Sequence, residues 1–240
     1  GSGVHGEVLF DFLREIGALG VIQRSDINTS TLLVSAGPLG LRSRASKRLL
    51  DVAISLAAGV VVLPIAVIAA AAIRLEDGGP ILFRQKRVGR RNQLFTIYKL
   101  RTMKVERSDG DGHRSASKDD DRVTRVGRFL RRTSIDELPQ LFNVLRGDMS
   151  LVGPRPHATG SLAGERLFWE IDQRYWHRHS LRPGLTGLAQ IRGLRGATDH
   201  EDDLTSRLQS DLEYINGWTI LRDVRILFAT AMVLIHERAY

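Results

Sequence analysis

The pattern of apolar positions is most pronounced between Val52 and Ile73, where the chain is uncharged and almost wholly apolar. As a helix rising about 1.5 Å per residue, this run would extend roughly 33 Å, enough to cross a hydrocarbon core of about 30 Å. Pro64 lies just past the middle of the run and has no N–H to donate to the carbonyl of Val60, so it predicts a bend. The run therefore predicts a membrane helix with a kink.

Both flanks of this run are basic. The residues concerned are Arg42, Arg44, Lys47 and Arg48 before it, and Arg74, Arg84, Lys86, Arg87, Arg90 and Arg91 after it. Because basic flanks favour the cytoplasm, both ends of the helix favour the same side of a membrane. We therefore expect a re-entrant helix over about residues 48–75, with an ordinary transmembrane helix that tolerates its proline as the alternative.

Shorter patterns predict the remaining elements. Alternation predicts strands at Ile81–Gln85 and Leu94–Leu100, which would form a small β-hairpin. Helices are expected over Val4–Gln23 and Val126–Arg132. The apolar stretch Ile220–Ile235 has too short an uninterrupted part to span a membrane and is expected to pack in the core or lie along the membrane interface. The polar stretch at residues 104–121 predicts a mobile loop, and whether it acts as a lid is left open.

The composition of the chain indicates what kind of molecule it binds. The chain has no cysteine, which excludes disulfides and cysteine-based metal sites. Its net charge of +8 is concentrated between Arg84 and Arg132, where sixteen Lys and Arg face six Asp and Glu. This predicts an anionic partner, which could be nucleic acid, phospholipid head groups or a phosphorylated small molecule. The membrane segment makes nucleic acid the weakest of these three, and we expect none to bind.

Two adjacent carboxylates, Asp136 and Glu137, precede a helical pattern. Leu138, Leu141, Phe142 and Leu145 are spaced to share one helix face. A helix with Asp136 as its N-cap would place Pro139 third, among the N–H groups that have no partner inside the helix. Sequence alone leaves two roles open for the carboxylates, namely capping the helix and complementing its dipole, or chemistry.

The basic surroundings favour chemistry on a phosphate ester. Arginines stand directly before and after the acidic pair, at Arg128, Arg131, Arg132 and Arg146. In such a setting one carboxylate can attack phosphorus while the other holds Mg²⁺, whose remaining ligands come from phosphate and water. Arg155, fixed between Pro154 and Pro156, would be aimed in advance at an anion, although it could equally be a solvated arginine in a rigid turn.

Several separate motifs together resemble one family. They are Lys99-x-Arg101-Thr102-Met103, Asp120-x-Arg122-Val123-Thr124, the segment Ser134 to Leu141, Gly147 to Pro156, and Pro183-Gly184-Leu185-Thr186-Gly187. In this order, over roughly residues 46–235, they resemble the bacterial sugar transferases, the monotopic polyprenyl-phosphate phosphoglycosyl transferases. The resemblance implies an α+β fold with a kinked re-entrant N-terminal helix, a small β-hairpin or sheet, and several amphipathic helices at the cytoplasmic membrane face.

The resemblance also implies an activity. Such an enzyme moves a sugar 1-phosphate from a UDP-sugar to undecaprenyl phosphate and releases UMP, in the first membrane step of exopolysaccharide biosynthesis at the bacterial inner membrane. By resemblance to the branch that uses hexose 1-phosphate, the sugar would be glucose or galactose. Asp136 would be the nucleophile that forms a covalent phosphosugar intermediate, and Glu137 would help to bind Mg²⁺. The wider substrate site would comprise Lys99, Arg101, Arg131, Asp148, Arg155, Arg195 and Asp211.

Domain organisation follows from these assignments. Gly1 to Gly3 look like a cloning remnant, so residues 1–45 are expected to be that remnant with a linker, or the end of an upstream region. Residues 46–240 would form the catalytic domain, including the membrane helix. Oligomeric state is left open, a homodimer included. A non-catalytic, membrane-attached module that binds phosphate or anionic lipid is the alternative to an enzyme.

Overall fold

The computed structural model describes residues 20–24, 29–33, 39–105, 120–194, 196, 198 and 200–235. The chain divides into two compact units, residues 1–38 and 39–240. In the first unit β1 (Gly20–Arg24) pairs antiparallel with β2 (Thr29–Leu33). The predicted helix over Val4–Gln23 is therefore wrong for residues 20–23, where β-branched residues pair with a Thr-rich partner strand. The rest of that predicted helix lies outside the described residues.

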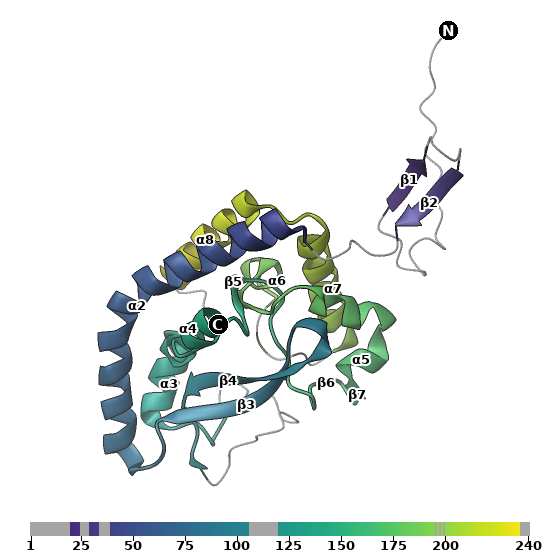
Figure 1. Cartoon of the computed structure of the whole chain (residues 1–240). Coiled ribbons are helices and arrows are strands. Elements are labelled where there is room, and N and C mark those ends of the chain that lie inside the picture. The colour runs from purple at the N-terminus through teal and green to yellow at the C-terminus, as the bar shows by residue number, and fades with distance from the viewer. Residues whose placement is uncertain are drawn as a thin grey trace. The chain divides into compact units, whose positions relative to one another are not determined.

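The second unit begins with α2 (Leu41–Asp77), a continuous helix of 37 residues that contains Pro64. It ends at Gly78, whose φ of 70° lies in the left-handed region and whose N–H donates to the carbonyl of Arg74. Figure 1 shows the ribbon of α2 as unbroken and bending around one side of the unit. Among the described helices, α2 is the one long and apolar enough to cross a membrane.

The apolar side chains of α2 are exposed mainly in its middle. Its buried residues lie near its two ends: Lys47, Asp51 and Ser55 at the start, and Ala69 and Ile73 towards the finish. Between them, exposed side chains include Leu56, Val60, Val61, Leu63, Val67 and Ile68. A contiguous exposed apolar surface of this kind is typical of contact with a membrane. The helix is therefore suited to membrane association, while its re-entrant path stays a prediction.

Cysteine labelling tests that path, since these 240 residues contain no cysteine to interfere. Single cysteines at the exposed positions Ser46 and Leu75 are expected to resist an impermeant maleimide in intact spheroplasts and to react after permeabilisation. Glu165→Cys, on the surface of the globular part, serves as the marker for the cytoplasmic side. Labelling of either end of α2 in intact cells, with Glu165→Cys still protected, would mean that the helix spans the membrane.

The predicted hairpin is confirmed. β3 (Leu82–Val88) and β4 (Leu94–Leu100) pair antiparallel and are joined through the 3-10 turn η1 (Arg90–Asn92). A second, parallel pair joins β5 (Ser150–Val152) to β8 (Gly184–Thr186). Here the backbones approach so closely that a Cβ on Gly184 would lie 2.1 Å from the amide nitrogen of Gly153. Glycine is therefore required at position 184, where the backbone of β8 passes close to Gly153 at the end of β5.

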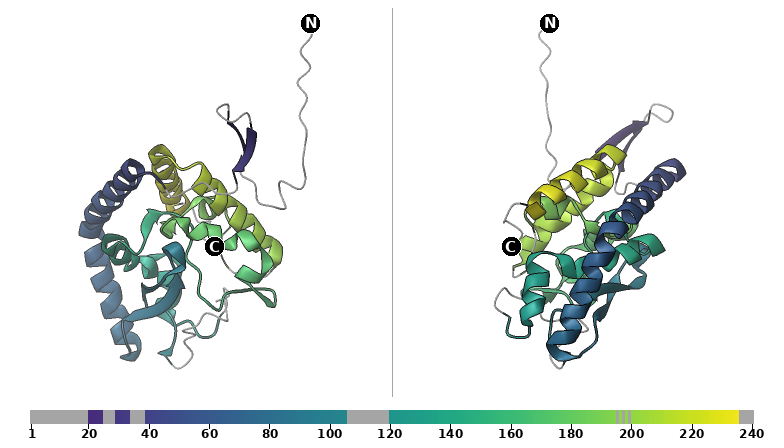
Figure 2. Two further views of the ribbon diagram at one scale, coloured as in Figure 1. Left: turned by 45° about the vertical axis from the view of Figure 1, so that its right-hand side comes forward. Right: turned by 90° about the vertical axis from the view of Figure 1, so that its left-hand side faces the viewer.

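The remaining elements are helices of 3 to 16 residues and a second small hairpin, formed by β6 and β7. They are α3 (Arg125–Arg132), η3 (Ile135–Glu137), α4 (Gln140–Arg146), β6 (Leu162–Ala163), β7 (Arg166–Leu167), α5 (Phe168–Ile171), η4 (Gln173–Ser180), α6 (Leu188–Ile191), α7 (Glu201–Asn216) and α8 (Ile220–Ile235). Figure 2 shows α8 lying beside the first half of α2, and these two helices are in contact. The mixture of helices with small sheets confirms the α+β class.

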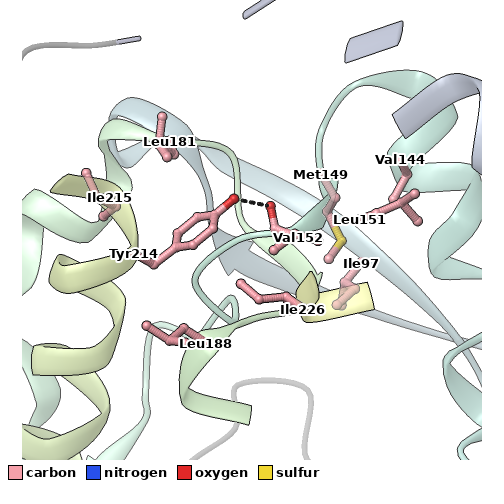
Figure 3. Close-up of a cluster of buried hydrophobic side chains, with 10 residues drawn as sticks. All are labelled: Ile97, Val144, Met149, Leu151, Val152, Leu181, Leu188, Tyr214, Ile215 and Ile226. Atoms are coloured by element: carbon pink, nitrogen blue, oxygen red, sulfur yellow. Dashed lines mark hydrogen bonds between the residues drawn. The ribbon is translucent and has the colours of Figure 1, made fainter. Parts of the chain in front are cut away.

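The main core joins segments that are far apart in the chain. Figure 3 shows Tyr214 of α7 and Ile226 of α8 packed with Ile97 of β4, Val144 of α4 and Val152 of β5. The Tyr214 hydroxyl donates to the carbonyl of Val152 over 3.2 Å. This packing fixes β5, and with it the start of the loop that leads to Arg155.

A buried polar network ties the start of α2 to the same core. Lys47 Nζ lies 2.7 Å from an Asp223 carboxylate oxygen and also donates to Tyr214 and to the carbonyl of Val152. One turn later, Asp51 accepts from the Ser150 hydroxyl and from the backbone N–H of Leu151, each over 2.9 Å. The start of α2 is thus fastened to the strand that precedes the Arg155 loop.

Candidate active site

The two carboxylates lie on a tight turn and not at the start of a helix. Ser134 adopts a left-handed conformation with φ of 56°, and the 3-10 turn η3 follows it. The predicted helix with Asp136 as N-cap is wrong, because α4 begins only after Pro139, which occupies the N-cap position itself. The residues before Pro139 are held by 3-10 hydrogen bonds, from the Glu137 N–H to the carbonyl of Ser134 and from the Leu138 N–H to the carbonyl of Ile135. Asp136 therefore caps no helix here.

Asp136 is buried without a hydrogen-bond partner. Its side chain belongs to a residue that is only 8% exposed, and no residue of the described part of the chain donates to it. Burial raises the pKa of Asp136 to about 6, against the opposing effect of Lys99 and with a further increase from Glu137. An unpartnered carboxylate among cations is free to interact with a ligand.

Glu137 has the opposite environment. Its Oε1 lies 2.7 Å from Lys99 Nζ and 2.6 Å from a terminal nitrogen of Arg155. Burial alone would raise the pKa of Glu137, but the two cations Arg155 and Lys99 hold it well below the usual range. Adjacent carboxylates whose pKa values are pushed apart are typical of sites in which the two groups have different tasks.

Arg155 is supported from behind by a buried ion pair. Arg178 donates from one terminal nitrogen to the carbonyl of Arg155 over 2.8 Å and to Asp211 over 2.6 Å. Both Arg178 and Asp211 are almost fully buried. Asp211, predicted as a substrate-site residue, therefore contacts Arg178, which in turn contacts the Arg155 loop. Sequence reasoning missed Arg178, because no local pattern relates it to a partner 33 residues away.

The other predicted site residues lie at varying positions around this centre. Arg131 donates to the Thr102 hydroxyl over 2.8 Å and stabilises the charged form of Asp136. Arg101 is bound to Asp77 and to the carbonyl of Pro80, so it fastens the end of α2. Its substrate role, like that of Arg131, stays a prediction.

Two further residues were predicted to belong to the substrate site, Asp148 and Arg195. Asp148, at the far end of α4, is 3.4 Å from Arg146 Nε. No contact of Asp148 with Asp136 or Glu137 occurs in the part of the chain that the structure describes, and its substrate role stays a prediction. Arg195 lies outside the described residues.

The donor set around Asp136 suits Mg²⁺ in type. The described residues contain no group of three or more His, Asp or Glu side chains that could hold a metal by themselves. Mg²⁺, however, commonly takes only one or two protein carboxylates and completes its shell with phosphate and water. The unpartnered carboxylate of Asp136 beside that of Glu137 fits this requirement.

Comparison with known proteins places the chain in a family. The family model described as bacterial sugar transferase matches residues 42–237. Undecaprenyl-phosphate glucose phosphotransferase of Komagataeibacter xylinus is 47% identical over 201 residues, which are 84% of this chain and 38% of that protein. This chain thus spans well under half of that relative's length.

Two further relatives are matched over most of their own length. Exopolysaccharide production protein PSS of Rhizobium leguminosarum bv. phaseoli is 46% identical over 186 residues, 78% of this chain and 93% of that protein. UDP-glucose:undecaprenyl-phosphate glucose-1-phosphate transferase of Caulobacter vibrioides is 48% identical over 220 residues, 90% of this chain and 81% of that protein. These matches confirm the resemblance read from the motifs and, with it, the prediction of an enzyme: the chain belongs to the bacterial sugar transferase family.

Proposed function

We propose that the protein transfers a hexose 1-phosphate from a UDP-sugar to undecaprenyl phosphate through a phosphosugar bound to Asp136. The observation that supports this most is the buried, unpartnered carboxylate of Asp136 among Lys99, Arg131 and Arg155. The donor and acceptor follow from the names of relatives that act on UDP-glucose and undecaprenyl phosphate. Glucose is the first sugar to test, with galactose second.

The proposed reaction has two displacements at the same phosphorus. A carboxylate oxygen of Asp136 attacks the β-phosphorus of the donor, the bond to the bridging oxygen breaks, and UMP leaves with that oxygen and its electron pair. An oxygen of undecaprenyl phosphate then attacks the phosphorus of the adduct, and the Asp136 carboxylate is released. Lys99 and Arg155, which both contact Glu137, would stabilise charge on the phosphoryl oxygens. Mg²⁺, which Glu137 would help to hold, would neutralise further phosphate charge when bound.

The two-step path suits the location that α2 implies. The donor is soluble, whereas the acceptor phosphate is attached to a lipid, so the two need not occupy the site together if a covalent intermediate links the steps. We propose that α2 holds the site at the cytoplasmic face of the bacterial inner membrane. The exposed apolar middle of the helix would lie in lipid, with the globular part outside it.

A donor panel tests the proposal directly. Purified protein in nanodiscs is incubated with Mg²⁺ and separately with UDP-glucose, UDP-galactose and UDP-N-acetylglucosamine, and then weighed by intact mass spectrometry. We expect a hexose-phosphate adduct with one UMP released for each adduct, and loss of the adduct when undecaprenyl phosphate is added. Neither adduct nor UMP with any donor would contradict the proposal and favour the non-catalytic binding module.

The rate of adduct formation should depend on pH in a defined direction. Only the carboxylate form of Asp136 attacks, and burial raises its pKa to about 6. At donor concentrations well below saturation, where the rate reports the ligand-free protein, we expect the single-turnover rate to fall about tenfold per pH unit below 6 and to level off above 7. Rapid-quench measurements between pH 5 and 8 check this. A rate that stays flat over that range would show that the nucleophile does not titrate there.

A further inference from the structure

Arg87 is a second arginine that contacts the loop of Arg155. In the β3–β4 register Arg87 lies opposite Phe95, and Phe83 lies opposite Lys99. Since alternate residues of a strand share a face, Arg87 and Lys99 belong to the same face of the hairpin. One terminal nitrogen of Arg87 donates to the carbonyl of Pro156 over 3.1 Å, and the other donates to Gln85 Oε1 over 2.5 Å.

The guanidinium of Arg87 has no carboxylate partner. The described part of the chain contains no Asp or Glu within ion-pair distance of it, and its Nε is buried without any hydrogen bond. Two more deeply buried arginines of the unit differ in this respect, since Arg178 is paired with Asp211 and Arg101 with Asp77. A half-buried guanidinium that is hydrogen-bonded only to neutral oxygens costs free energy of folding, so the presence of Arg87 points to a ligand that supplies the opposite charge.

The nearest charged groups show what that ligand must be. Burial lowers the pKa of Arg87 to about 10, helped by Arg155 and opposed by Glu137, so the group remains cationic at neutral pH. Glu137 already accepts from both Lys99 and Arg155. The site thus has four cations, Lys99, Arg131, Arg155 and Arg87, against two carboxylates. These cations leave an excess of positive charge even before any Mg²⁺ binds, and a diphosphate diester, with two negative charges, would offset it.

We propose that Arg87 is a positioning residue of the phosphoryl site, supplying the positive charge that a diphosphate balances and holding, through Pro156, the loop that presents Arg155. The naming of a nucleotide sugar as the source of the diphosphate rests on the proposed function. The recognition of a phosphate-type anion does not, because it rests on the uncompensated charge of Arg87 and not on the reaction.

Three variants of the full chain in nanodiscs test this inference. Arg87→Gln removes both the positive charge and the forked guanidinium group. Arg87→Lys keeps the positive charge but has no guanidinium with which to donate two hydrogen bonds at once. Lys86→Gln is the matched control, because it removes the same charge from the neighbouring, exposed residue on the opposite face of the strand. Circular dichroism and thermal unfolding establish that each variant is folded, and Arg87→Lys remains informative if Arg87→Gln is not.

Binding of inorganic pyrophosphate and of UDP, measured by isothermal titration calorimetry, is the first readout. We expect affinity to fall about 10- to 100-fold in Arg87→Gln, and by less than about fivefold in Arg87→Lys, since hydrogen bonds to charged groups have this magnitude. Lys86→Gln should bind within about twofold of the natural protein. Unchanged affinity in a folded Arg87→Gln variant would overturn the inference.

Kinetics provide the second readout, which a purely structural role would not change. In Arg87→Lys we expect kcat for adduct formation to fall about tenfold with the donor KM within about threefold, because the charge remains while Arg155 is less well placed. A structural defect would instead lower the fraction of protein that forms adduct, with rate and KM unchanged in the remainder. That outcome would overturn the positioning role.

Failure of this inference can be told apart from failure of the proposed function. If the natural protein forms no adduct with any donor while pyrophosphate binding still weakens in Arg87→Gln, the function is wrong and the role of Arg87 in anion recognition stands. If the natural protein forms adduct normally, and Arg87→Gln changes neither the affinity for pyrophosphate nor the rate of adduct formation, the proposed function is supported and the inference about Arg87 is wrong.

Discussion

Replacing Asp136 with asparagine is expected to abolish the phosphosugar adduct, with a loss in rate of at least about 10³-fold. Asparagine has nearly the same shape, so it occupies the turn η3 without disturbing Glu137, but its amide oxygen is a poor nucleophile. The adduct is measured by intact mass and mapped by peptide analysis after incubation with the donor that the natural protein prefers. Glu137→Gln is the comparison variant, expected to form adduct about 10- to 100-fold more slowly because the nucleophile remains.

Stability provides the control for this result. The native pKa of Asp136, about 6, lies above its ordinary value of 3.8, so the native state binds this proton more tightly than the unfolded state does. The contribution of this group to stability is therefore present below pH 4 and is lost as the pH rises through 6. Asp136→Asn carries no such charge and should be more stable than the natural protein at pH 7, by up to about 3 kcal/mol. An inactive variant that is less stable would leave misfolding as the explanation, and an adduct on another residue would contradict the role of Asp136.

Patterns that are local in sequence predicted the corresponding elements well. The alternation in β3 and β4, with a turn between them, contained the information for the hairpin, and its strand Leu94–Leu100 has the predicted bounds. The long apolar helix α2 followed from the length and hydropathy of one unbroken run of residues. In both cases the physical cause acts within a few residues of the chain.

The details of the site depended on interactions that no local pattern contains. The left-handed conformation of Ser134 sets the turn that releases Asp136 from the start of α4, although nothing in a serine residue signals a positive φ. The partners of Asp211 and Asp223 lie 33 and 176 residues away. Such contacts become visible only when the fold brings the segments together. The motifs could therefore single out Asp136 and Glu137 and predict a role for each, but they could not reveal the residues that hold Arg155.

The buried pair of Arg178 and Asp211 should separate stability from catalysis. Asp211→Ala leaves Arg178 buried with an uncompensated charge and is expected to lower the free energy of unfolding by about 3–5 kcal/mol. Glu213→Ala, which removes the exposed partner of Arg192 and Arg222, should cost less than about 1 kcal/mol and serves as the matched control. Chemical denaturation in detergent measures both.

The double variant Arg178→Met with Asp211→Leu removes both charges, so much of the lost stability should return. Adduct formation should nevertheless remain at least about tenfold slower than in the natural protein, because the carbonyl of Arg155 has lost its buried donor and the guanidinium on Glu137 is less firmly placed. Rapid-quench rates on the double variant decide between the two roles. Full recovery of the rate together with stability would show that the pair only supports the fold, whereas stability without rate shows that it positions Arg155.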